Sequence, residues 1–383
     1  MSILNNKTFR DILSQFIVVT ALVLFIWHIV GNLQHNIEVR GITTGFAFFG
    51  DKAGFGISES PISYSEDSTY FRAFLVGLTN TVYVSFVGIF FASILGVIIG
   101  VGRLSKNFLI SKLSLLYVEF FRNIPLLLQI LFWYNIVLAA LPGPRQSIAL
   151  WANCFLNNRG FYIPKPIFGT SFEYVVLAFV VAIGLVVFLS KWATKRFEET
   201  GKDMLVWPWA ILILVTIPLV VFNLLGSPLS FDYPALRGFN FRGGMSYSPE
   251  FLALAFALSV YTASLIAEAV RSGIEAVAKG QKEAAASLGL TSYQSLKLVV
   301  LPQAIRIAIP PILGQYLNLI KNSSLATAIG YPEIVTVFSG TVLNQTGQAI
   351  EIIAVTMAVY LTISLFVSLI LNIVNKKLAI KER

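Results

Sequence analysis

Long apolar stretches separated by short polar segments dominate the pattern of this sequence. A helix needs about 20 residues to cross a membrane, and the backbone must be helical there because lipid offers no hydrogen-bond partners. The pattern therefore predicts eight transmembrane helices, at residues 12–31, 73–102, 113–141, 174–190, 205–225, 249–270, 303–321 and 348–374. The first stretch has a basic start and no small-residue cleavage site, so we expect an uncleaved signal-anchor span.

Composition supports an integral membrane protein. The chain is 56% hydrophobic and 12% charged, whereas soluble domains carry about 25% charged residues. The net charge of +9 is dispersed, with no basic or aromatic nucleic-acid motif, so we assign it to the flanks of membrane spans. The single Cys154 excludes an internal disulfide, and neither it nor His28 and His35 has metal-ligand spacing, so we expect no metal site.

Basic residues predict the orientation of the spans, because cytoplasmic segments of membrane proteins carry an excess of Lys and Arg. With the N-terminus inside, the inside segments hold 18 of the 28 basic residues and the outside segments hold nine. The inside set is Lys7, Arg10, Arg103, Lys106, Lys112, Lys191, Lys195, Arg196, Lys202, Arg271, Lys279, Lys282, Lys297, Arg306, Lys376, Lys377, Lys381 and Arg383. We therefore expect both termini in the cytoplasm.

The stretch "KEAAASLGLTSYQSLKLVVLP", Lys282 to Pro302, falls in a cytoplasmic segment between two spans. Helical periodicity predicts a helix over Ile274–Leu288, with a shallow apolar stripe formed by Ile274, Val277, Ala284, Ala285 and Leu288. Gly289 stands where a left-handed residue would end that helix. Thr291 to Gln294 reads as a capping box that starts a second short helix, and Pro302 can open the next span. The alternative is a loop that merely folds on itself.

Two Glu-x-x-Arg pairs lie within spans near their cytoplasmic ends, Glu119 with Arg122 and Glu268 with Arg271. Spacing of three residues places both members of a pair on one helix face. Charges in lipid are costly and face a partner or a cavity. Each pair is either an inner gate that changes between transport states or a static contact that orients helices. We also expect Pro125 to kink the third span just beyond Arg122.

A polar group, Lys321, Asn322, Ser323 and Ser324, follows the short seventh span, which contains Pro310 and Pro311. Short, proline-interrupted helices that end in polar residues often build a substrate path in transporters. An ordinary polar helix end is the alternative.

The cytoplasmic element resembles the "EAA" signature of ABC importer permeases. The signature reads here as Glu283-Ala284-Ala285, three residues, Gly289, nine residues, then Val299 to Pro302, with Val299 in place of the usual Ile. The resemblance implies a coupling helix that docks into a groove on a separate ATPase subunit. The coupling residues it implies are Gly280, Glu283, Ala284, Ala285, Leu288, Gly289, Leu301 and Pro302.

Three further stretches resemble the polar amino acid permeases, which include the histidine, glutamine, glutamate and general L-amino-acid systems. They are "YVEFFRNIPLLLQILFWY", "YTASLIAEAVRSGIEAVAKGQKEAA" and "YLNLIKNSSLATAIGYPEI". The run after Lys321 is most similar to one of the two permeases of the general L-amino-acid and glutamate/glutamine/aspartate/asparagine importers. The resemblance implies an all-α membrane protein with a type I importer core of five helices plus three extra ones.

The resemblance also divides the chain. Residues 1–72 would hold the first span and an outside loop, and 73–141 the first part of the permease core. Residues 142–245 would be an insertion with two extra spans, and 246–383 the second part of the core, with the coupling element at 274–302.

We therefore expect a permease subunit of an ATP-driven importer in a bacterial inner membrane, carrying polar L-amino acids delivered by a periplasmic binding protein. The chain lacks G-x-x-x-x-G-K-[ST], so we expect ATP and Mg to be bound by a partner ATPase dimer. No Ser/His/Asp set, metal cluster or carboxylate pair supports a membrane enzyme, so we expect a transport subunit without a cofactor of its own. A different, homologous permease would complete the pathway, with a homodimer of this chain as the alternative. The alternative is an ion-coupled secondary transporter or channel, which predicts an unpaired acid near the bilayer centre.

Overall fold

The computed structural model describes residues 7–41, 44–201 and 204–378, so Lys202, Lys381 and Arg383 lie outside the described residues. The chain forms two units, Met1–Trp133 with Ala253–Arg383 (unit 1) and Tyr134–Leu252 (unit 2). Within the described residues, seven helices are long and apolar enough to cross a membrane, and a bent helix pair makes an eighth candidate span. The predicted helical membrane fold is confirmed, and the described residues provide seven to eight candidate spans for the eight predicted.

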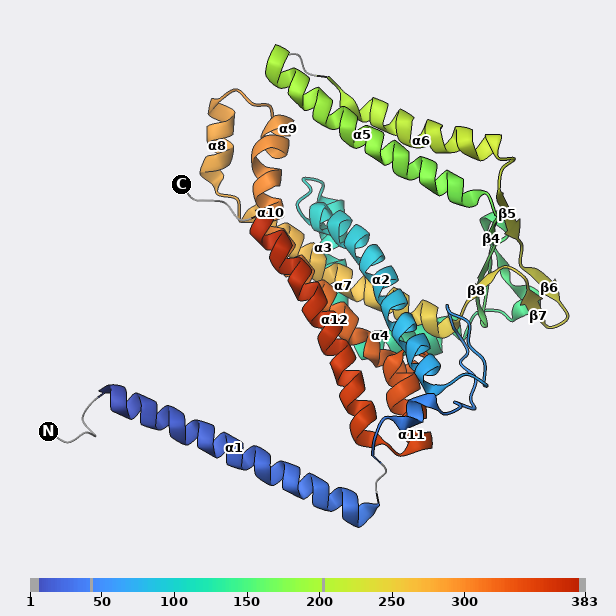
Figure 1. Ribbon diagram of the computed structural model, residues 1–383. Helices are drawn as coiled ribbons and strands as arrows, with labels where there is room; N and C mark the ends of the chain where they lie inside the picture. Colours follow the sequence, from blue (N-terminus) through green and yellow to red (C-terminus); the bar gives the residue numbers. More distant parts are fainter. Residues whose placement is uncertain (1–6, 42–43, 202–203, 379–383) are drawn as a thin grey trace. The chain divides into compact units, whose positions relative to one another are not determined.

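Unit 1 contains most of the helices (Figure 1). They are α1 (Lys7–Arg40), α2 (Tyr70–Arg103), α3 (Phe108–Asn123), α4 (Leu126–Phe132), most of α7 (Pro249–Glu275), α8 (Lys279–Ser287), α9 (Ser292–Ser295), α10 (Leu301–Asn322), α11 (Leu343–Thr346) and α12 (Ala349–Leu378). The π-helices Leu296–Val300 and Val335–Val342 and the 3₁₀-helix Ser323–Ile329 connect several of them.

Helix α7 is the most buried of the candidate spans. Glycines on α2 let the two backbones approach closely, as small residues do between membrane helices. A Cβ on Gly96 would lie 2.6 Å from the side chain of Ile266, and one on Gly100 would lie 2.8 Å from the carbonyl oxygen of Ala267. The Tyr117 hydroxyl donates to the carbonyl oxygen of Val260 at 2.8 Å, which ties α3 to the same helix. These contacts make α7 the centre of unit 1.

The third predicted span is broken rather than kinked. Helices α3 and α4 meet at 100° across Ile124 and Pro125. Ile124 is extended (φ −95°, ψ 127°), as a residue before proline prefers to be. The buried Gln129 side chain donates to the carbonyl oxygens of Phe121 and Ile124 at 2.9 Å each and so satisfies backbone groups freed by the break. The interruption predicted at Pro125 is therefore confirmed, but it is a break of 100° rather than a kink, because proline ends the helix there.

Unit 2 pairs a helical hairpin with small β-sheets. Helices α5 (Phe172–Thr200) and α6 (Val206–Leu224) pack against each other. The strands are β1 (Ile148–Ala149), β2 (Phe155–Asn157), β3 (Gly160–Ile163), β4 (Lys165–Phe168), β5 (Leu229–Asp232), β6 (Ala235–Arg237), β7 (Asn240–Arg242) and β8 (Met245–Tyr247). They form antiparallel sheets of order β1-β2-β3-β8, β4-β5 and β6-β7. These strands were not predicted, because two- to four-residue strands leave too short a pattern to recognise.

Candidate functional site

The helices α8 and α9 form a hairpin whose turn is locked by backbone hydrogen bonds. Gly289 has φ +73°, so the left-handed conformation predicted for it is confirmed. The amide of Leu290 donates to the carbonyl oxygen of Ala285 at 3.1 Å, and that of Gly289 donates to Ala286 at 2.9 Å. These two hydrogen bonds together form a Schellman motif, which satisfies carbonyl groups at the end of α8. The turn is therefore a defined structure, not a free loop.

The predicted helix over Ile274–Leu288 is wrong, because α7 continues to Glu275 and α8 starts only at Lys279. The predicted stripe is divided accordingly. Val277 and Ala285 are each 3% exposed, and Ile274 packs against the small core formed by Val277, Val300 and Ala304. The stripe members Ala284 and Leu288 face outward instead, and Leu288 is 81% exposed. Three members of the stripe therefore pack inward, and the two others, Ala284 and Leu288, remain available to a partner.

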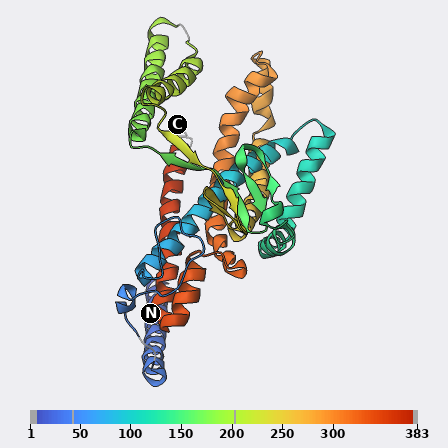
Figure 2. The same cartoon turned by 90° about the vertical axis from the view of Figure 1, so that its right-hand side faces the viewer.

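The second helix of the hairpin starts as predicted. The Thr291 hydroxyl accepts from the amide of Gln294 at 3.3 Å, and the Gln294 side chain accepts from the amide of Thr291 at 2.9 Å. This is the capping box expected from the sequence. Figures 1 and 2 show α9 running on into α10 beside α8.

Pro302 does not open a separate span. One continuous helix runs from Ser292 to beyond Asn322. The π-turn Leu296–Val300 lies directly before Leu301 and Pro302, and the amide of Leu301 donates to Leu296. A π-turn shifts the hydrogen-bond register, and this accommodates a residue that has no amide hydrogen. Helices α9 and α10 are therefore parts of one continuous helical element.

The outward face of the hairpin presents apolar side chains that the sequence analysis only partly identified. Leu288 and Gly289 lie at the turn, and Tyr293, 71% exposed, lies beside them on α9. We call Ala284, Leu288, Gly289 and Tyr293 the hairpin tip. Of the other implied coupling residues, Gly280, Glu283, Leu301 and Pro302 are also exposed. A tyrosine between polar residues in a segment predicted to be cytoplasmic was the signal that could have identified Tyr293.

The pair Glu268 and Arg271 exists and belongs to a larger network at the end of α7. Arg271 donates to Glu268 at 2.5 Å and also pairs with Glu275. Arg103, the last residue of α2, pairs with Glu268 from the neighbouring helix. Arg103 was missed because it lies 165 residues from Glu268 in the sequence, and the local pattern of a single sequence does not show contacts between such distant residues. The network joins the ends of α2 and α7 close to the segment that leads into α8.

The other pair is not formed. Among the described residues, Glu119 makes no ion pair with Arg122, and its side chain accepts from Asn123 at 3.3 Å. Both charged side chains are exposed on α3. Two exposed charges on a membrane helix need an aqueous cavity or a neighbouring subunit.

The polar group at the end of α10 lies partly at the surface. Lys321 is exposed, whereas Ser323 is buried and donates to the carbonyl oxygen of Ile320 at 2.7 Å. Ser324 donates to the carbonyl oxygen of Lys321 at 2.8 Å, and Asn322 is half-buried. Both hydroxyls thus satisfy local backbone groups, and Lys321 is the exposed member of this polar group.

A buried carboxylate was missed by the sequence analysis. Glu333 is fully buried and accepts from the amides of Val335 and Thr336 at 2.9 and 2.8 Å. It also accepts from the hydroxyls of Thr336, Thr327 and Tyr360 at 3.1, 3.3 and 3.1 Å. This side chain joins the 3₁₀-helix after α10, the π-helix and α12. The signal was present in the run "GYPEI", where an acid opens a helix.

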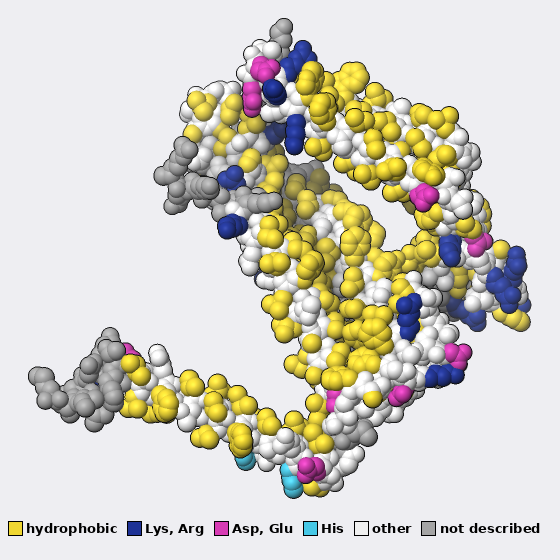
Figure 3. All heavy atoms as spheres, in the orientation of Figure 1, with side chains coloured by type: hydrophobic (Ala, Val, Ile, Leu, Met, Phe, Trp, Pro, Cys, Tyr) yellow, Lys and Arg dark blue, Asp and Glu magenta, His cyan; other side chains and the backbone are white. Residues whose placement is uncertain are grey.

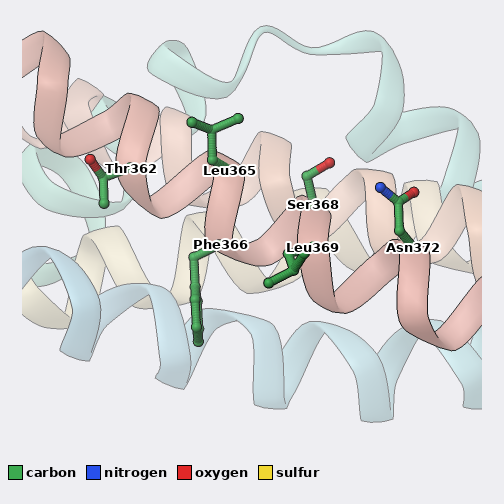
Figure 4. A pocket seen from close by; sticks show the side chains of 6 residues that line it. All are labelled: Thr362, Leu365, Phe366, Ser368, Leu369 and Asn372. Carbon is green, nitrogen blue, oxygen red and sulfur yellow. The ribbon is translucent and has the colours of Figure 1, made fainter.

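A hollow of about 550 Å³ lies on α12, lined by Thr362, Leu365, Phe366, Ser368, Leu369 and Asn372 (Figure 4). All of its lining comes from one face of one helix, and none of it is charged. An amino-acid ligand carries an ammonium and a carboxylate, which need charged or strongly polar partners. The hollow therefore does not have the chemistry of an amino-acid site.

Comparison with known proteins identifies a set of relatives. Residues 88–380 match the family described as "Binding-protein-dependent transport system inner membrane component". The chain is 53% identical to the putative amino-acid ABC transporter permease protein YhdX of Escherichia coli K12, covering 99% of this chain and 96% of that protein. It is 50% identical to the general L-amino acid transport system permease protein AapQ of Rhizobium johnstonii, covering 100% and 95%.

A third relative is the glutamate/glutamine/aspartate/asparagine transport system permease protein BztB of Rhodobacter capsulatus, 38% identical over 99% of this chain and 96% of that protein. Among solved structures, a chain of an amino acid ABC transporter with histidines covers 80% of this chain and 95% of its own length, at 19% identity and a TM-score of 0.49.

Proposed function

Because this chain belongs to the family of binding-protein-dependent transport system inner membrane components, we propose that it forms part of the membrane pathway through which an ATP-driven importer takes up polar L-amino acids. It is a multi-pass permease subunit of an amino-acid ABC transporter. Permeases of this family associate with an ATPase and a binding protein. The proposal adds the substrate class, the way ATP hydrolysis reaches the membrane, and the orientation.

The observation that carries the proposal is the α8–α9 hairpin. Its turn is fixed by the Schellman motif at Gly289, Val277 in the segment that leads into α8 packs on Val300 and Ala304, and the tip exposes Leu288 and Tyr293. Exposed apolar side chains on a structurally fixed hairpin can bind in a groove of another protein with little loss of conformational entropy. We infer that the groove belongs to the ATPase subunit, which binds ATP and Mg in place of this chain.

The continuous helix from Ser292 through α10 supports a direct mechanism. Closure of the ATPase dimer on ATP would move the hairpin tips, and each tip would move the end of its own α10. The Arg103–Glu268–Arg271 network lies at the same end of α7 and would act either as a gate or as a strut. Alternating access between two sides of the membrane then follows from rigid helices rather than from a flexible loop.

Three further features belong to the proposal. The chain lies in a bacterial inner membrane with both termini in the cytoplasm, as the distribution of Lys and Arg favours. A homologous second permease completes the pathway. Polar L-amino acids are the substrates, supported by the printed names of the relatives AapQ and BztB.

The test is uptake by the complete transporter in proteoliposomes. Radiolabelled L-amino acids are offered one at a time with the binding protein outside and ATP inside, and each is competed with an excess of the unlabelled panel. We expect uptake of acidic and amide amino acids, and weak uptake of large apolar ones. Uptake of apolar amino acids alone would contradict the proposed substrate class.

A further inference from the structure

Unit 2 carries an unusual concentration of arginine. The segments 142–171 and 226–248 contain five basic residues, Arg145, Arg159, Lys165, Arg237 and Arg242, and a single acid, Asp232. The Asp232 carboxylate is already engaged, because it accepts from the amide of Gly244, on the other side of the β6–β7 hairpin in sequence, at 2.9 Å. These segments are outside in the proposed orientation, where basic residues are normally depleted. The cluster therefore needs an explanation other than membrane topology.

The four arginines gather around one hairpin. In the β6–β7 ladder, Arg237 pairs with Asn240 and Ala235 pairs with Arg242. Residues directly opposite each other, and residues two apart on a strand, share a face, so Arg237 and Arg242 leave the same face of the hairpin. The opposite face is anchored by the buried Phe241, whose ring lies 4.7 Å from Phe155 and 4.9 Å from Tyr162.

The other two arginines meet the tip of this hairpin. The Arg145 guanidinium lies over the Phe239 ring, 4.6 Å from its centroid, and Arg159 donates to the Phe239 carbonyl oxygen at 3.4 Å. Arg145, Arg159 and Phe239 line a hollow of about 240 Å³ together with Gly143, Pro144 and Gln146. We call Arg145, Arg159, Arg237 and Arg242 the arginine cluster. Figure 3 shows basic side chains gathered where β6 and β7 lie in Figure 1.

The arginine cluster is accessible. All four side chains are exposed, and among the described residues no ion pair involves any of them. Phe239, between two of them, is 74% exposed. Its ring is exposed except where the Arg145 guanidinium lies over it.

The chemistry of the cluster favours carboxylates on a protein surface. Guanidinium groups bind carboxylates through two parallel hydrogen bonds, and arginine and exposed aromatic residues are enriched in protein interfaces. The hairpin is fixed by Phe241, so little order is lost when a partner binds. The family description itself names a binding protein as part of the transport system.

We propose that the arginine cluster of unit 2 is a docking surface for an acidic face of the transporter's extracytoplasmic binding protein. The inference rests on the proposed function, which places this unit on the outer side. Charges arranged in this way raise the rate at which the partner encounters the surface, and they fix its orientation. They contribute less to the contacts that hold the docked complex together. The cluster would thus set how much binding protein is needed, not how fast a docked complex turns over.

The test measures ATP hydrolysis by the complete transporter in proteoliposomes of neutral lipid, as a function of the concentration of amino-acid-loaded binding protein. The variant replaces all four arginines: Arg145→Gln, Arg159→Gln, Arg237→Gln and Arg242→Gln. A control combines Lys52→Gln with Lys165→Gln, which removes two charges that are outside in the proposed orientation and are not members of the cluster. A second variant places Lys at the same four positions and so keeps the charge without the paired hydrogen-bond geometry.

For the glutamine variant we expect the half-maximal binding-protein concentration to rise on the order of tenfold at low salt, with unchanged maximal hydrolysis. We also expect the salt dependence of this concentration to flatten, because screened charge pairs have been removed. The lysine variant should keep the salt dependence and show a smaller rise. The control should match the unaltered transporter.

Equal titration curves for the glutamine variant and the unaltered transporter would overturn the inference, as would a loss that appears only in vesicles of anionic lipid, since lipid headgroups would then be the partner. A different result bears on the proposed function. If the unaltered transporter itself shows no stimulation by the binding protein, the importer assignment fails before the cluster is tested.

Discussion

At the scale of single residues, Gly289 has the most direct consequence for coupling. Glycine adopts its φ of +73° without strain, whereas the same backbone conformation would raise the conformational energy of a β-branched residue by roughly 1–2 kcal/mol or more. No other atom lies within 4 Å of the Cβ position, so the effect of a substitution is conformational rather than steric. Gly289→Val should therefore reorient α9 and misplace Leu288 and Tyr293, while the spans still form.

The measurement is retention of the ATPase by detergent-solubilised variant, together with membrane abundance and binding-protein-stimulated ATP hydrolysis. The matched control is Gly289→Asn, because asparagine adopts left-handed conformations more readily than valine. We expect normal abundance for both, weak ATPase retention for valine and near-normal retention for asparagine. Normal retention, stimulation and uptake with valine would mean that the hairpin is an ordinary loop.

Glu333 is a residue-scale test of the packing around α12. Glu333→Ala leaves two amides and three hydroxyls without their buried acceptor. An unsatisfied buried group costs about 1–3 kcal/mol, although hydroxyls can turn to other acceptors. We expect a marked fall in the melting temperature of the purified protein. This temperature is measured by fluorescence-detected size-exclusion chromatography after heating. Tyr360→Phe, which removes one donor, should lower it much less. Equal melting of the two variants would contradict the role given to Glu333.

At the scale of helices, the α2–α7 contact depends on the absence of side chains. A Cβ on Gly96 would lie 2.6 Å from two atoms of Ile266, a β-branched side chain with little freedom to move. Gly96→Ala should therefore separate the helices and cost about 1–3 kcal/mol, as overpacking does. Gly314→Ala is the control, because no atom lies within 4 Å of its Cβ position on α10. A loss of folded protein with alanine at 314 but not at 96 would refute this packing.

The eight spans and the hairpin caps could be predicted because they depend on local sequence. Apolar runs set the spans, and Gly289, Thr291 and Gln294 set the turn through bonds to near neighbours. The break at Pro125 could be predicted only as a kink, since its 100° angle depends on the buried Gln129 contacts. Arg103 and the inward side of the α8 stripe depend on distant partners, and a single sequence does not show them.

At the scale of the whole molecule, the proposed topology places Lys195 and Arg196 inside and Lys165 and Arg159 outside. Single cysteines at positions 195 and 159, in a Cys154→Ser background, can be labelled with an impermeant thiol reagent in intact spheroplasts. Position 159 is exposed on unit 2 and should react, whereas position 195 should react only after the membrane is opened. Labelling of both positions in intact spheroplasts would exclude the eight-span arrangement.

The central claim is that transport through this chain is driven by ATP hydrolysed on another subunit. It is tested most directly by uptake of one labelled substrate amino acid into proteoliposomes that contain the complete transporter and external binding protein. One sample has ATP and Mg inside and no ion gradient, and the other has a proton or sodium gradient and no ATP. We predict uptake against a concentration gradient only with internal ATP, and its loss when the ATPase or the binding protein is omitted. Uptake driven by an ion gradient without ATP would identify a secondary transporter and contradict the account.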